Sequence, residues 1–405
     1  MIVVIDTNIG LVHALGLADG GRNKVYYAIQ NSDPYPKLKD LITGLGFEEI
    51  EKVDDYGDVL PECEYVVFTD SGFGGLADYL RKDGFYVFGA DKKSENLELD
   101  RVYMRRIFES LKISIPNAKI IRGISKLYDY IKNSTGKKFI KISKVRGDVE
   151  TIGTDDPEDI KLIISKSDLS FICDLYPFVV EDELEGVEIG VDALFTGKEW
   201  HPLIAETIEI KGAANLTKFV DYEDTVWKPV LEKLTPYLRK NGYRGYFCME
   251  GFYDGDKITP IDITPRYAYI CSHAYPYMIE NYADVILGVA RGEVVEAKVR
   301  NKYSTQIGIY TDEPDRWRTI KVDEEIKEKV SFRRAIKKDG KIYFVPGDYV
   351  CAVAVGEGST WKESIEDADK VVDGVEVIYS YEQSELAKEK FSKTIEKLKE
   401  YGYEF

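Results

Sequence analysis

The first hundred residues alternate short apolar runs with helical patterns, and this alternation constrains the fold more than any other feature. Residues 2–6 (IVVID), 65–70 (YVVFTD) and 85–89 (FYVFG) have the length and composition of strands. The stretches between them include residues 10–18 (GLVHALGLA) and 74–84 (GGLADYLRKDG), which have helical spacing. This order predicts a mostly parallel, doubly wound sheet, a fold that binds ligands at the carboxyl ends of its strands.

The size and charge of the chain limit its organisation and its partners. With 405 residues, 44% of them hydrophobic, it exceeds the size at which a single core stops growing, so we expect two to four structural units. The formal net charge of −17 repels nucleic-acid phosphate and anionic lipid, so we expect neither as a partner, while a local basic pocket could still hold a small phosphate. The start, MIVVID, has the pattern of a strand and not of a signal peptide, and no apolar stretch has the length of a bilayer span.

The cysteine and histidine content narrows the chemistry. The five cysteines are scattered without a C-x-x-C pair, which is typical of reduced thiols, so we expect a cytoplasmic location and no disulfide frame. The three histidines, His13, His201 and His273, argue against a histidine-based zinc site and against a Ser-His-Asp triad.

Residues 249–266 (MEGFYDGDKITPIDITPR) predict a β-hairpin whose second strand alternates polar and apolar side chains. Successive side chains of a strand point to opposite faces, so the two kinds separate. The polar face holds Asp262, Thr264 and Arg266, and the apolar face holds Ile261, Ile263 and Pro265.

The loop of this hairpin decides whether Glu250, on the first strand, shares the polar face. A three-residue loop, 254–256, pairs Cys248 with Asp262 and puts Glu250 diagonal to Asp262, with about 7–8 Å between their Cα atoms. A two-residue Asp-Gly turn puts the acids on opposite faces. Two carboxylates on one face suit Mg²⁺, and Arg266 would direct its fork of donors at the same phosphates. The alternative is a solvated strand face with balanced charge.

Two further segments carry charge in patterns that suit a nucleotide. Residues 138–150 (KFIKISKVRGDVE) place Lys141 on a strand and Lys144 on the turn after it, where cations can cradle a triphosphate; a lysine-rich surface hairpin is the alternative. Residues 179–191 (VVEDELEGVEIGV) form an acidic turn between strands, whose carboxylates could accept hydrogen bonds from ribose hydroxyls. The alternative there is a solvated acidic loop.

The order and spacing of these three segments resemble the ATP-grasp superfamily and, within it, the phosphoribosylamine–glycine ligase family, over nearly the whole chain. FIKISK matches the strand that carries the ATP-phosphate lysine, VVEDELEGVEIGV is similar to the hinge IEEFLxGEEAS, and IDITPR aligns with the metal motif EFNxR. GLVHALG is similar to the N-terminal GREHAL, and residues 345–375 resemble the C-terminal domain.

The resemblance implies roles for individual residues. It implies ATP contacts for Arg101, Lys141, Lys144, Glu181, Glu183, Leu184 and Glu188. It implies magnesium ligands at Glu250, Asp262 and Thr264, with Mn²⁺ as the alternative ion, and catalytic roles for Lys141 and Arg266. It implies substrate contacts for Gly10, His13, Asp70, Ser71, Gly72 and Arg266.

The chain also departs from the family pattern. The glycine-rich loop GKGV is replaced by VRGDVET, the metal-site Glu and Asn by Asp262 and Thr264, and the lysine of the family's SK pair by Arg101. GDPE after the family arginine is replaced by YAYIC, and the Arg-Glu of the N-terminal GGRE by Leu11-Val12. The last two changes and the arginine replacement affect substrate recognition more than ATP chemistry, so the acid and the amine are the open part of the prediction.

The expected fold is a multidomain α/β and α+β protein. We expect a doubly wound N-terminal substrate-binding domain (1–115) and an ATP-grasp lid (116–180). We then expect an ATP-grasp metal and nucleotide subdomain (181–298) and a small α/β C-terminal cap (299–405).

The resemblance implies an ATP-dependent carboxylate–amine ligase of purine biosynthesis that forms an acyl phosphate with Mg²⁺ and then an amide, from glycine and 5-phosphoribosylamine. No covalent protein nucleophile is needed, since catalysis is positioning plus charge stabilisation under a lid that excludes water. The alternatives are a diverged ligase that joins a different amino acid and amine, and a non-catalytic nucleotide-binding protein. The expected partners are small molecules, and the expected state is a monomer or homodimer.

Overall fold

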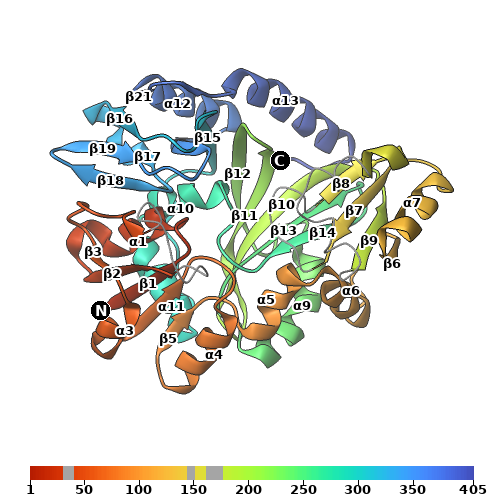
Figure 1. The fold of residues 1–405 in the computed structure, drawn as a ribbon, viewed down its shortest axis with the longest axis horizontal. Coiled ribbons are helices and arrows are strands. Elements are labelled where there is room, and N and C mark those ends of the chain that lie inside the picture. The colour runs from red at the N-terminus through yellow and green to blue at the C-terminus, as the bar shows by residue number, and fades with distance from the viewer. Residues whose placement is uncertain (31–40, 144–150, 161–176) are drawn as a thin grey trace.

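The structure is a computed structural model, and it describes residues 1–30, 41–143, 151–160 and 177–405. The described chain forms four β-sheets. Figure 1 shows the N-terminal sheet on one side, a small sheet on the other, and a large sheet between them, with α13 (Ser384–Glu400) along one edge.

The N-terminal sheet has five parallel strands in the order β3-β2-β1-β4-β5. Its strands are β1 (Ile2–Asp6), β2 (Val25–Ile29), β3 (Glu51–Val53), β4 (Tyr65–Phe68) and β5 (Tyr86–Phe88). Its helices are α1 (Leu11–Ala18), α3 (Tyr56–Val59) and α4 (Gly74–Lys82), with short 3-10 turns at Asp19–Gly21 and Leu60–Glu62.

Helices cover both faces of this sheet. Leu11 of α1 packs in one apolar cluster with Val4, while Ala77 of α4 packs in another with Val3 and Ile5. The predicted parallel, doubly wound sheet is therefore confirmed. The strand order reverses between β1 and β4, so the chain that leaves these two strands meets at one edge, which is where such sheets bind ligands.

Two helices, α5 (Lys92–Leu99) and α6 (Arg101–Ser110), connect the N-terminal sheet to the rest of the chain. Asp100 separates them: its backbone is extended, and its carboxylate accepts hydrogen bonds from the backbone N–H of Val102 (3.1 Å) and Tyr103 (3.0 Å). A side chain that caps a new helix ends the previous one. Residues 92–110 therefore form two helices and not one.

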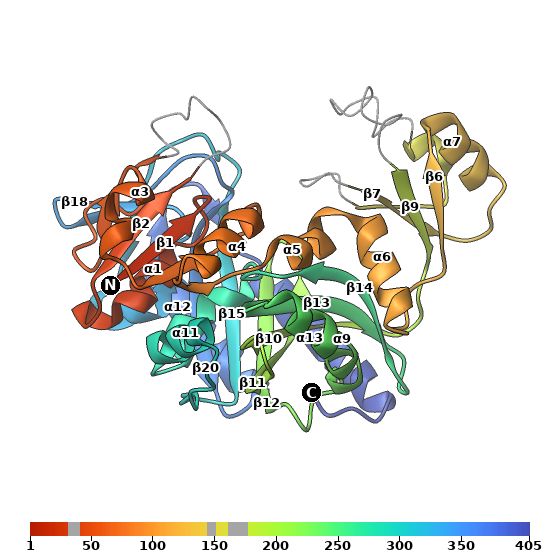
Figure 2. The same ribbon diagram turned by 90° about the horizontal axis from the view of Figure 1, so that it is seen from below.

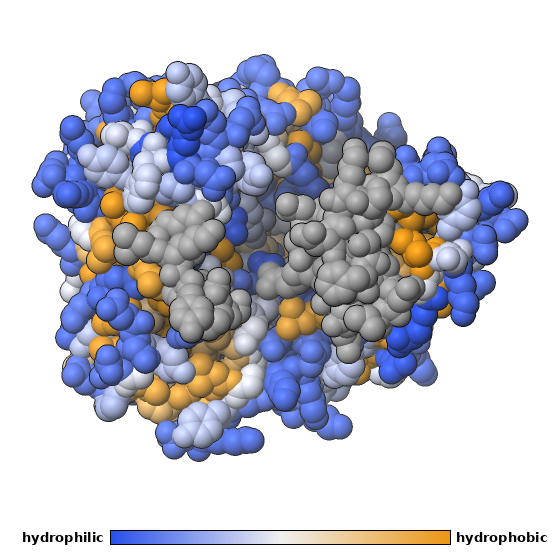
Figure 3. All heavy atoms as spheres, viewed as in Figure 1, coloured by the Kyte–Doolittle hydropathy of each residue, from blue (hydrophilic) through white to orange (hydrophobic). Residues whose placement is uncertain are grey.

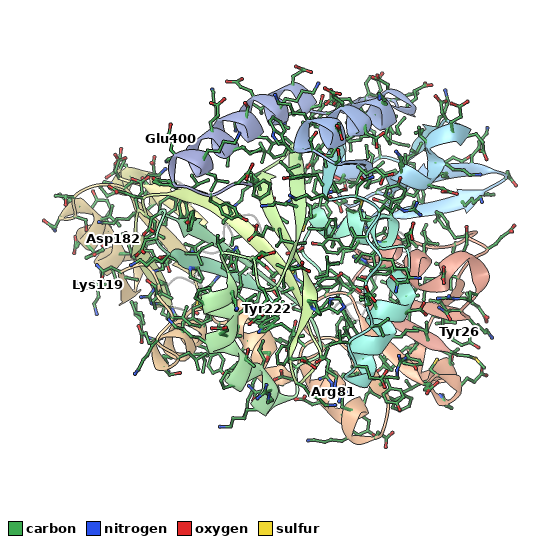
Figure 4. The ribbon with its side chains drawn as sticks, turned by 180° about the vertical axis from the view of Figure 1, so that it is seen from behind. Tyr26, Arg81, Lys119, Asp182, Tyr222 and Glu400 are labelled. Atoms are coloured by element: carbon green, nitrogen blue, oxygen red, sulfur yellow. The ribbon has the colours of Figure 1, made fainter. Side chains whose placement is uncertain are left out.

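The small sheet has four antiparallel strands in the order β6-β9-β7-β8. They are β6 (Ala118–Arg122), β7 (Lys138–Ile142), β8 (Thr151–Thr154) and β9 (Pro177–Asp182), and they pack with α7 (Ile124–Lys132). Its apolar core is separate from the main core. Figure 4 places Lys119 and Asp182 of this sheet at the opposite end of the molecule from Tyr26 on the parallel sheet.

The large sheet has nine strands, all antiparallel, in the path β14-β13-β10-β11-β12-β15-β20-β17, with β22 on β15. They are β10 (Val187–Phe195), β11 (Trp200–Ile210), β12 (Ala214–Asp221), β13 (Gly245–Tyr253), β14 (Ile258–Thr264), β15 (Tyr303–Thr311), β17 (Val330–Ser331), β20 (Val350–Gly358) and β22 (Ser380–Tyr381). The helices that accompany it are α9 (Lys228–Asn241), α10 (Tyr275–Met278), α11 (Tyr282–Arg291), α12 (Trp361–Asp373) and α13, with 3-10 turns at Cys271–Ala274 and Glu324–Lys329.

The fourth sheet has the order β18-β19-β16-β21. Its strands are β16 (Arg318–Val322), β18 (Ala335–Lys338), β19 (Lys341–Phe344) and β21 (Val375–Val377). The predicted boundary at residue 298 falls between β12 and β15, which are hydrogen-bonded neighbours in the large sheet. The four-domain division of the sequence stays a prediction.

Figure 2 shows the arrangement from below: the parallel sheet lies on one side, the small sheet on the other, and α5 and α6 between them. The face drawn in Figure 3 is mostly hydrophilic, with apolar patches scattered over it. Within the described part of the chain, no helix combines the length and the apolar composition needed to cross a membrane.

Candidate nucleotide and metal site

The β13–β14 hairpin brings two carboxylates face to face by way of a β-bulge. Tyr253 pairs with Ile258 across a four-residue loop, a register that would put Ile261 opposite Glu250. The register shifts between Glu250 and Gly251, so that Glu250 pairs directly with Asp262. One extra residue in a strand exchanges the faces of everything that follows it. The shared face of the two acids is as expected, but the expected register, with a three-residue loop and Cys248 opposite Asp262, is wrong.

The rest of this strand follows from the bulge. Cys248 pairs with Thr264, so Thr264 lies on the same face as the two acids. Ile263 and Pro265 are buried on the opposite face. Ile261 is only half-buried and lines a cavity together with Asp262, so its expected place on the apolar face is wrong. The backbone carbonyl of Ile261 accepts a hydrogen bond from Lys141 Nζ at 2.5 Å.

Further acids gather around Glu250. Burial, followed by the charges of Glu209 and Asp262, raises the pKa of Glu250 well above its usual range. Burial also raises the pKa of Glu209, whose carboxyl shares a hydrogen bond with Glu250. Lys211, which follows the end of β11, is the balancing cation: burial opposes its charge, but Glu250, Glu188 and Glu209 raise its pKa. Crowded carboxylates of this kind would be stabilised by divalent cations.

Lys141 lies on β7 of the small sheet, and its side chain reaches the β13–β14 hairpin. Lys141 and Glu181 project from the same face of neighbouring strands β7 and β9, and their charged groups are 2.9 Å apart. Glu181 also pairs with Arg105 of α6 at 3.3 Å. All three side chains are almost fully buried, so the ion pairs fix the small sheet to α6 and aim Lys141 at the bulge.

Asp262 is held by Arg101 at the start of α6. The guanidinium binds both carboxylate oxygens, with 3.2 Å between Nη2 and Oδ2 and a short contact at Nη1. Burial opposes ionisation of Asp262, but the charge and hydrogen bonds of Arg101, together with Lys141, outweigh it and lower its pKa. A cation at Asp262 would therefore compete with Arg101.

Three cavities lie in series through this region. The lid cavity, about 210 Å³, lies between the small sheet and the hairpin. The middle cavity, about 160 Å³, shares four wall residues with the lid cavity: Glu188, Lys211, Glu250 and Asp262. The strand-end cavity, about 10 Å³, shares Ala268 and Tyr269 with the middle cavity and reaches the end of β1.

The residues expected to contact ATP and metal largely converge on the first two cavities. The lid cavity is lined by five of the expected ATP residues: Lys141, Glu181, Glu183, Leu184 and Glu188. The middle cavity is lined by all three expected metal ligands: Glu250, Asp262 and Thr264. Lys144 lies outside the described residues. The roles of these residues remain predictions.

Arg266 lies beyond Thr264, at the junction with the N-terminal sheet. Its guanidinium pairs with Asp70, which follows β4, at 3.0 Å and with Glu98 of α5 at 2.8 Å. Burial opposes its charge, but Glu98 and Asp70 outweigh burial and raise its pKa. Arg266 therefore joins three elements, and any anion that it binds must share it with two carboxylates.

The expected substrate residues lie at the edge where β1 and β4 end. The Ser71 hydroxyl donates to Glu98 (2.5 Å), and the backbone N–H of Gly72 donates to Glu95 (2.8 Å). The backbone N–H of Gly10 donates to the buried Asp6 carboxylate (2.9 Å). These hydrogen bonds hold in place the loops that follow β1 and β4. Loops on a rigid sheet commonly form the binding site, so their conformation determines which ligand fits.

His13 lines the strand-end cavity together with Gly10. Its ring stacks on Tyr267 with 3.6 Å between ring centroids, and its nitrogens bond to the hydroxyls of Tyr282 (3.0 Å) and Ser272 (3.3 Å). Burial, aided by the charge of His273, holds the pKa of His13 well below its usual value. His13 is thus a neutral ring at the back of the cavity.

Three charged residues of the site were not anticipated from the sequence: Glu209, Lys211 and Asp192. Glu209 lies on β11 and Lys211 follows its last residue, in the segment ETIEIKG, where charged residues alternate with Ile208 and Ile210. That alternation shows which side chains share a face, but not that the face borders a cavity.

The donor set fits magnesium in its chemistry. Among the described residues, no three His, Cys, Asp or Glu side chains are already gathered around one point. Glu250 and Asp262 nevertheless face each other, Glu209 and Glu188 border the same cavity, and like charge opposes their joint ionisation. Oxygen ligands with unbalanced negative charge suit Mg²⁺, which would neutralise phosphate charge when bound.

No protein-family model matches the chain. Its sequence is 23% identical to the carbamoyl phosphate synthase large chain of Clostridium acetobutylicum, over 87% of this chain and 35% of that protein, so it spans about a third of that relative. It is also 23% identical to the phosphoribosylamine–glycine ligase of Helicobacter pylori, over 67% of each chain.

Solved structures share the fold. The phosphoribosylamine–glycine ligase of Thermotoga maritima has a TM-score of 0.74 at 18% identity, and the match covers 94% of this chain and 98% of that one. The biotin carboxylase of Campylobacter jejuni, solved in a complex with ATP, has a TM-score of 0.67 at 11% identity, covering 94% and 93%. The chain therefore shares the fold of these solved structures, the ATP-grasp fold that its motifs predicted.

Proposed function

We propose that the protein is an ATP-dependent carboxylate–amine ligase that works through an acyl phosphate. The observation that carries the proposal is the series of three cavities, in which neighbours share walls. ATP would bind in the lid cavity, the acid in the middle cavity and the amine from the strand ends. Each reactant would then meet the next across a shared wall, the positioning that such a two-step reaction requires.

In the first step, a carboxylate oxygen of the acid attacks the γ-phosphorus of ATP, the bond to the β,γ-bridging oxygen breaks, and ADP leaves with the electron pair. In the second, the amine nitrogen attacks the acyl carbon, the bond from carbon to the phosphate oxygen breaks, and phosphate leaves. The nitrogen loses a proton, and an amide remains.

The chain's own residues would act by binding and by excluding water. Lys141, which Glu181 and the Ile261 carbonyl hold in the wall of the lid cavity, would donate to a phosphate bound there. Glu250 and Asp262, with Thr264 beside them, would hold Mg²⁺ between the lid and middle cavities. The small sheet, with its separate core, would close over the acyl phosphate and protect it from hydrolysis.

The substrate pair that we propose first is glycine and 5-phosphoribosylamine. The similarity to two phosphoribosylamine–glycine ligases supports it, and the residues expected to contact the substrates lie at the strand ends, from which the amine would approach. A different amino acid and amine are the alternative, because the N-terminal and post-arginine motifs of that family are changed in this chain.

The test is ADP release from Mg·ATP across a panel of acids, each with and without 5-phosphoribosylamine and other small amines. Release that needs one acid and one amine, and that Asp262→Ala abolishes, is the expected result. Tight binding of Mg·ATP with no acid-dependent ADP release would favour a non-catalytic nucleotide-binding protein.

A further inference from the structure

A buried carboxylate borders the middle cavity and has no role in the chemistry above. Asp192 lies on β10 and is only 4% exposed. Its Oδ2 accepts hydrogen bonds from the Cys271 thiol (3.0 Å) and from the Tyr275 hydroxyl at short distance. Burial holds the pKa of the Cys271 thiol and of the Tyr275 hydroxyl well above their usual values, so both donors are neutral.

This environment is costly for a carboxylate. A buried charge is ordinarily matched by an opposite charge, and an ionised carboxylate offers about four acceptor positions. Thiols are weak donors. Within the described part of the chain, the groups that bind Asp192 are the neutral ones just named. A cationic ligand in the cavity would supply the missing charge.

The charges around the middle cavity also favour a ligand with a cationic group. Five carboxyl groups line it, at Glu188, Asp192, Glu209, Glu250 and Asp262, against one ammonium group, at Lys211. Metal ions between the phosphates and the hairpin would offset the acids near the lid cavity. Asp192 lines only the middle cavity, whereas Lys211 lies in the wall that the two cavities share, together with Glu188, Glu250 and Asp262. The one ammonium group of the middle cavity therefore lies at its end toward the lid cavity.

We propose that the middle cavity binds the acid substrate as a zwitterion, with Asp192 accepting hydrogen bonds from its ammonium group and Lys211 donating to its carboxylate. This inference rests on the proposed ligase function and identifies the residues that select its acid. The carboxylate then faces the lid cavity, where the γ-phosphate would lie. Bicarbonate and simple fatty acids lack the ammonium group, and a dicarboxylate adds a negative charge among five acids. The volume of about 160 Å³ restricts the amino acid to a small side chain.

Asp192→Asn tests the proposal, because it keeps the shape and removes the charge. The comparison is between each small amino acid and the same acid without its amino group: glycine against acetate, alanine against propionate. We expect the wild type to release ADP only with the amino acid. The variant should raise KM for the amino acid by about ten- to a hundredfold, the usual range for a hydrogen bond between charged groups, and leave KM for ATP unchanged.

Glu206→Gln is the matched control. Glu206 lies on β11 beside Thr207 but on the opposite face, is fully buried, and accepts hydrogen bonds from the hydroxyls of Thr225 (2.6 Å) and Tyr403. The Glu206→Gln variant therefore loses a buried charge that accepts hydrogen bonds from hydroxyl groups, and the wall of the middle cavity is unchanged. The control should keep the wild-type KM for the amino acid and the wild-type preference for it.

A second variant keeps the test decisive if Asp192→Asn fails to fold. Lys211 lies in the exposed turn that follows β11, so the chain should tolerate Lys211→Met. We expect this variant to raise KM for the amino acid but to keep the preference over the des-amino acid. An unchanged KM in Lys211→Met, or an unchanged preference in a folded Asp192→Asn, would overturn the inference.

The failure of the inference and the failure of the ligase proposal give different results. If the wild type releases ADP with acetate or bicarbonate as readily as with any amino acid, the ligase stands and the inference falls. If Mg·ATP binds but no acid promotes ADP release, the ligase proposal falls. Calorimetric titration of the twenty amino acids into the Mg·ATP complex then decides the inference: binding that Asp192→Asn removes supports it, and no binding by any amino acid overturns it.

Discussion

The side chain of Glu250 lowers the stability of the metal-free fold in a site that would bind a cation. It is half-buried beside Glu209 and opposite Asp262, and its pKa is raised well above the usual value near 4.5. Between that value and the raised pKa, the folded protein holds this proton more tightly than the unfolded chain does. The free energy of unfolding therefore falls as the pH rises through this interval.

Glu250→Gln removes this effect. We expect the metal-free variant to be more stable than the wild type by about 1–2 kcal/mol at about pH 8, with the difference shrinking toward about pH 5. Mg²⁺ should stabilise the wild type and not the variant, because a ligand stabilises only the state that binds it. Urea denaturation with and without Mg²⁺ measures both effects.

Asp254→Asn is the control for the sign. Asp254 lies at the exposed tip of the same hairpin, and the backbone N–H groups of Lys257 and Asp256 lower its pKa below the usual value. Its stabilisation is present above the usual pKa and is lost as the pH falls through the lowered one. This variant should thus be slightly less stable than the wild type at neutral pH. A Glu250→Gln variant less stable than the wild type at about pH 8 would contradict the account.

At the scale of elements, the β13–β14 hairpin is where sequence patterns carried the prediction furthest and then failed. The alternation along residues 258–266 places Asp262 and Thr264 on one face, as the structure has them. The pairing of this strand with β13 could not be predicted in the same way. The turn and the bulge each shift the register by one residue, and the two shifts together return Glu250 to the face of Asp262, from which one shift alone would remove it. The facing acids were predictable as a pattern, and the extra residue that aligns them was not.

Deletion of Ile261 tests what the bulge does. The deletion leaves Glu250 opposite Asp262 in an unbroken ladder but removes the carbonyl that accepts from Lys141 Nζ. We expect Mg²⁺ still to raise the melting temperature, while the Kd for Mg·ATP rises by about tenfold, since a hydrogen bond to a charged group is lost. Lys141→Met in the deleted background should add less than it does in the wild type, as a double-mutant cycle would show. Loss of the Mg²⁺ effect would mean that the bulge itself holds the acids.

Other elements also differ in how much of their structure the sequence predicts. The parallel sheet and the paired strands of Lys141 followed from periodicity and order, which local sequence encodes. The break at Asp100 required knowing that its carboxylate caps the next helix. The sequence could not predict that Glu209 and Asp192 border the site. Their surroundings depend on which strands become neighbours, and packing across the whole sheet decides this.

At the scale of the molecule, the N-terminal sheet and the hairpin are held together through Arg266. It pairs with Asp70 after β4 and with Glu98 of α5, and the side chains of all three are at most 16% exposed. The same guanidinium therefore aligns the strand-end loops with the middle cavity. The small sheet, by contrast, has an apolar core of its own and is tied to α6 by the Arg105–Glu181 ion pair.

Arg266→Met removes the cation that pairs with Asp70 and Glu98. We expect it to destabilise the protein by about 3 kcal/mol in urea denaturation, the usual cost of breaking a buried pair from one side. Adding Asp70→Asn should restore part of the loss, because it removes the charge of one of the two carboxylates that bound the guanidinium. Arg291→Met, whose partner Glu293 is exposed, is the matched control and should cost less than about 1 kcal/mol. Equal losses in the two arginine variants would show that Arg266 does not hold these elements together.

The most direct test of the account is positional isotope exchange in ATP labelled with ¹⁸O at the β,γ-bridging oxygen. Reversible transfer of the γ-phosphoryl group to an acid frees the β-phosphate of ADP to rotate, and the label then moves to a non-bridging position. The account predicts exchange that requires Mg²⁺ and one acid, needs no amine, and disappears in Glu250→Gln. ATP turnover without acid-dependent exchange, for every acid tested, would contradict an acyl phosphate at this site.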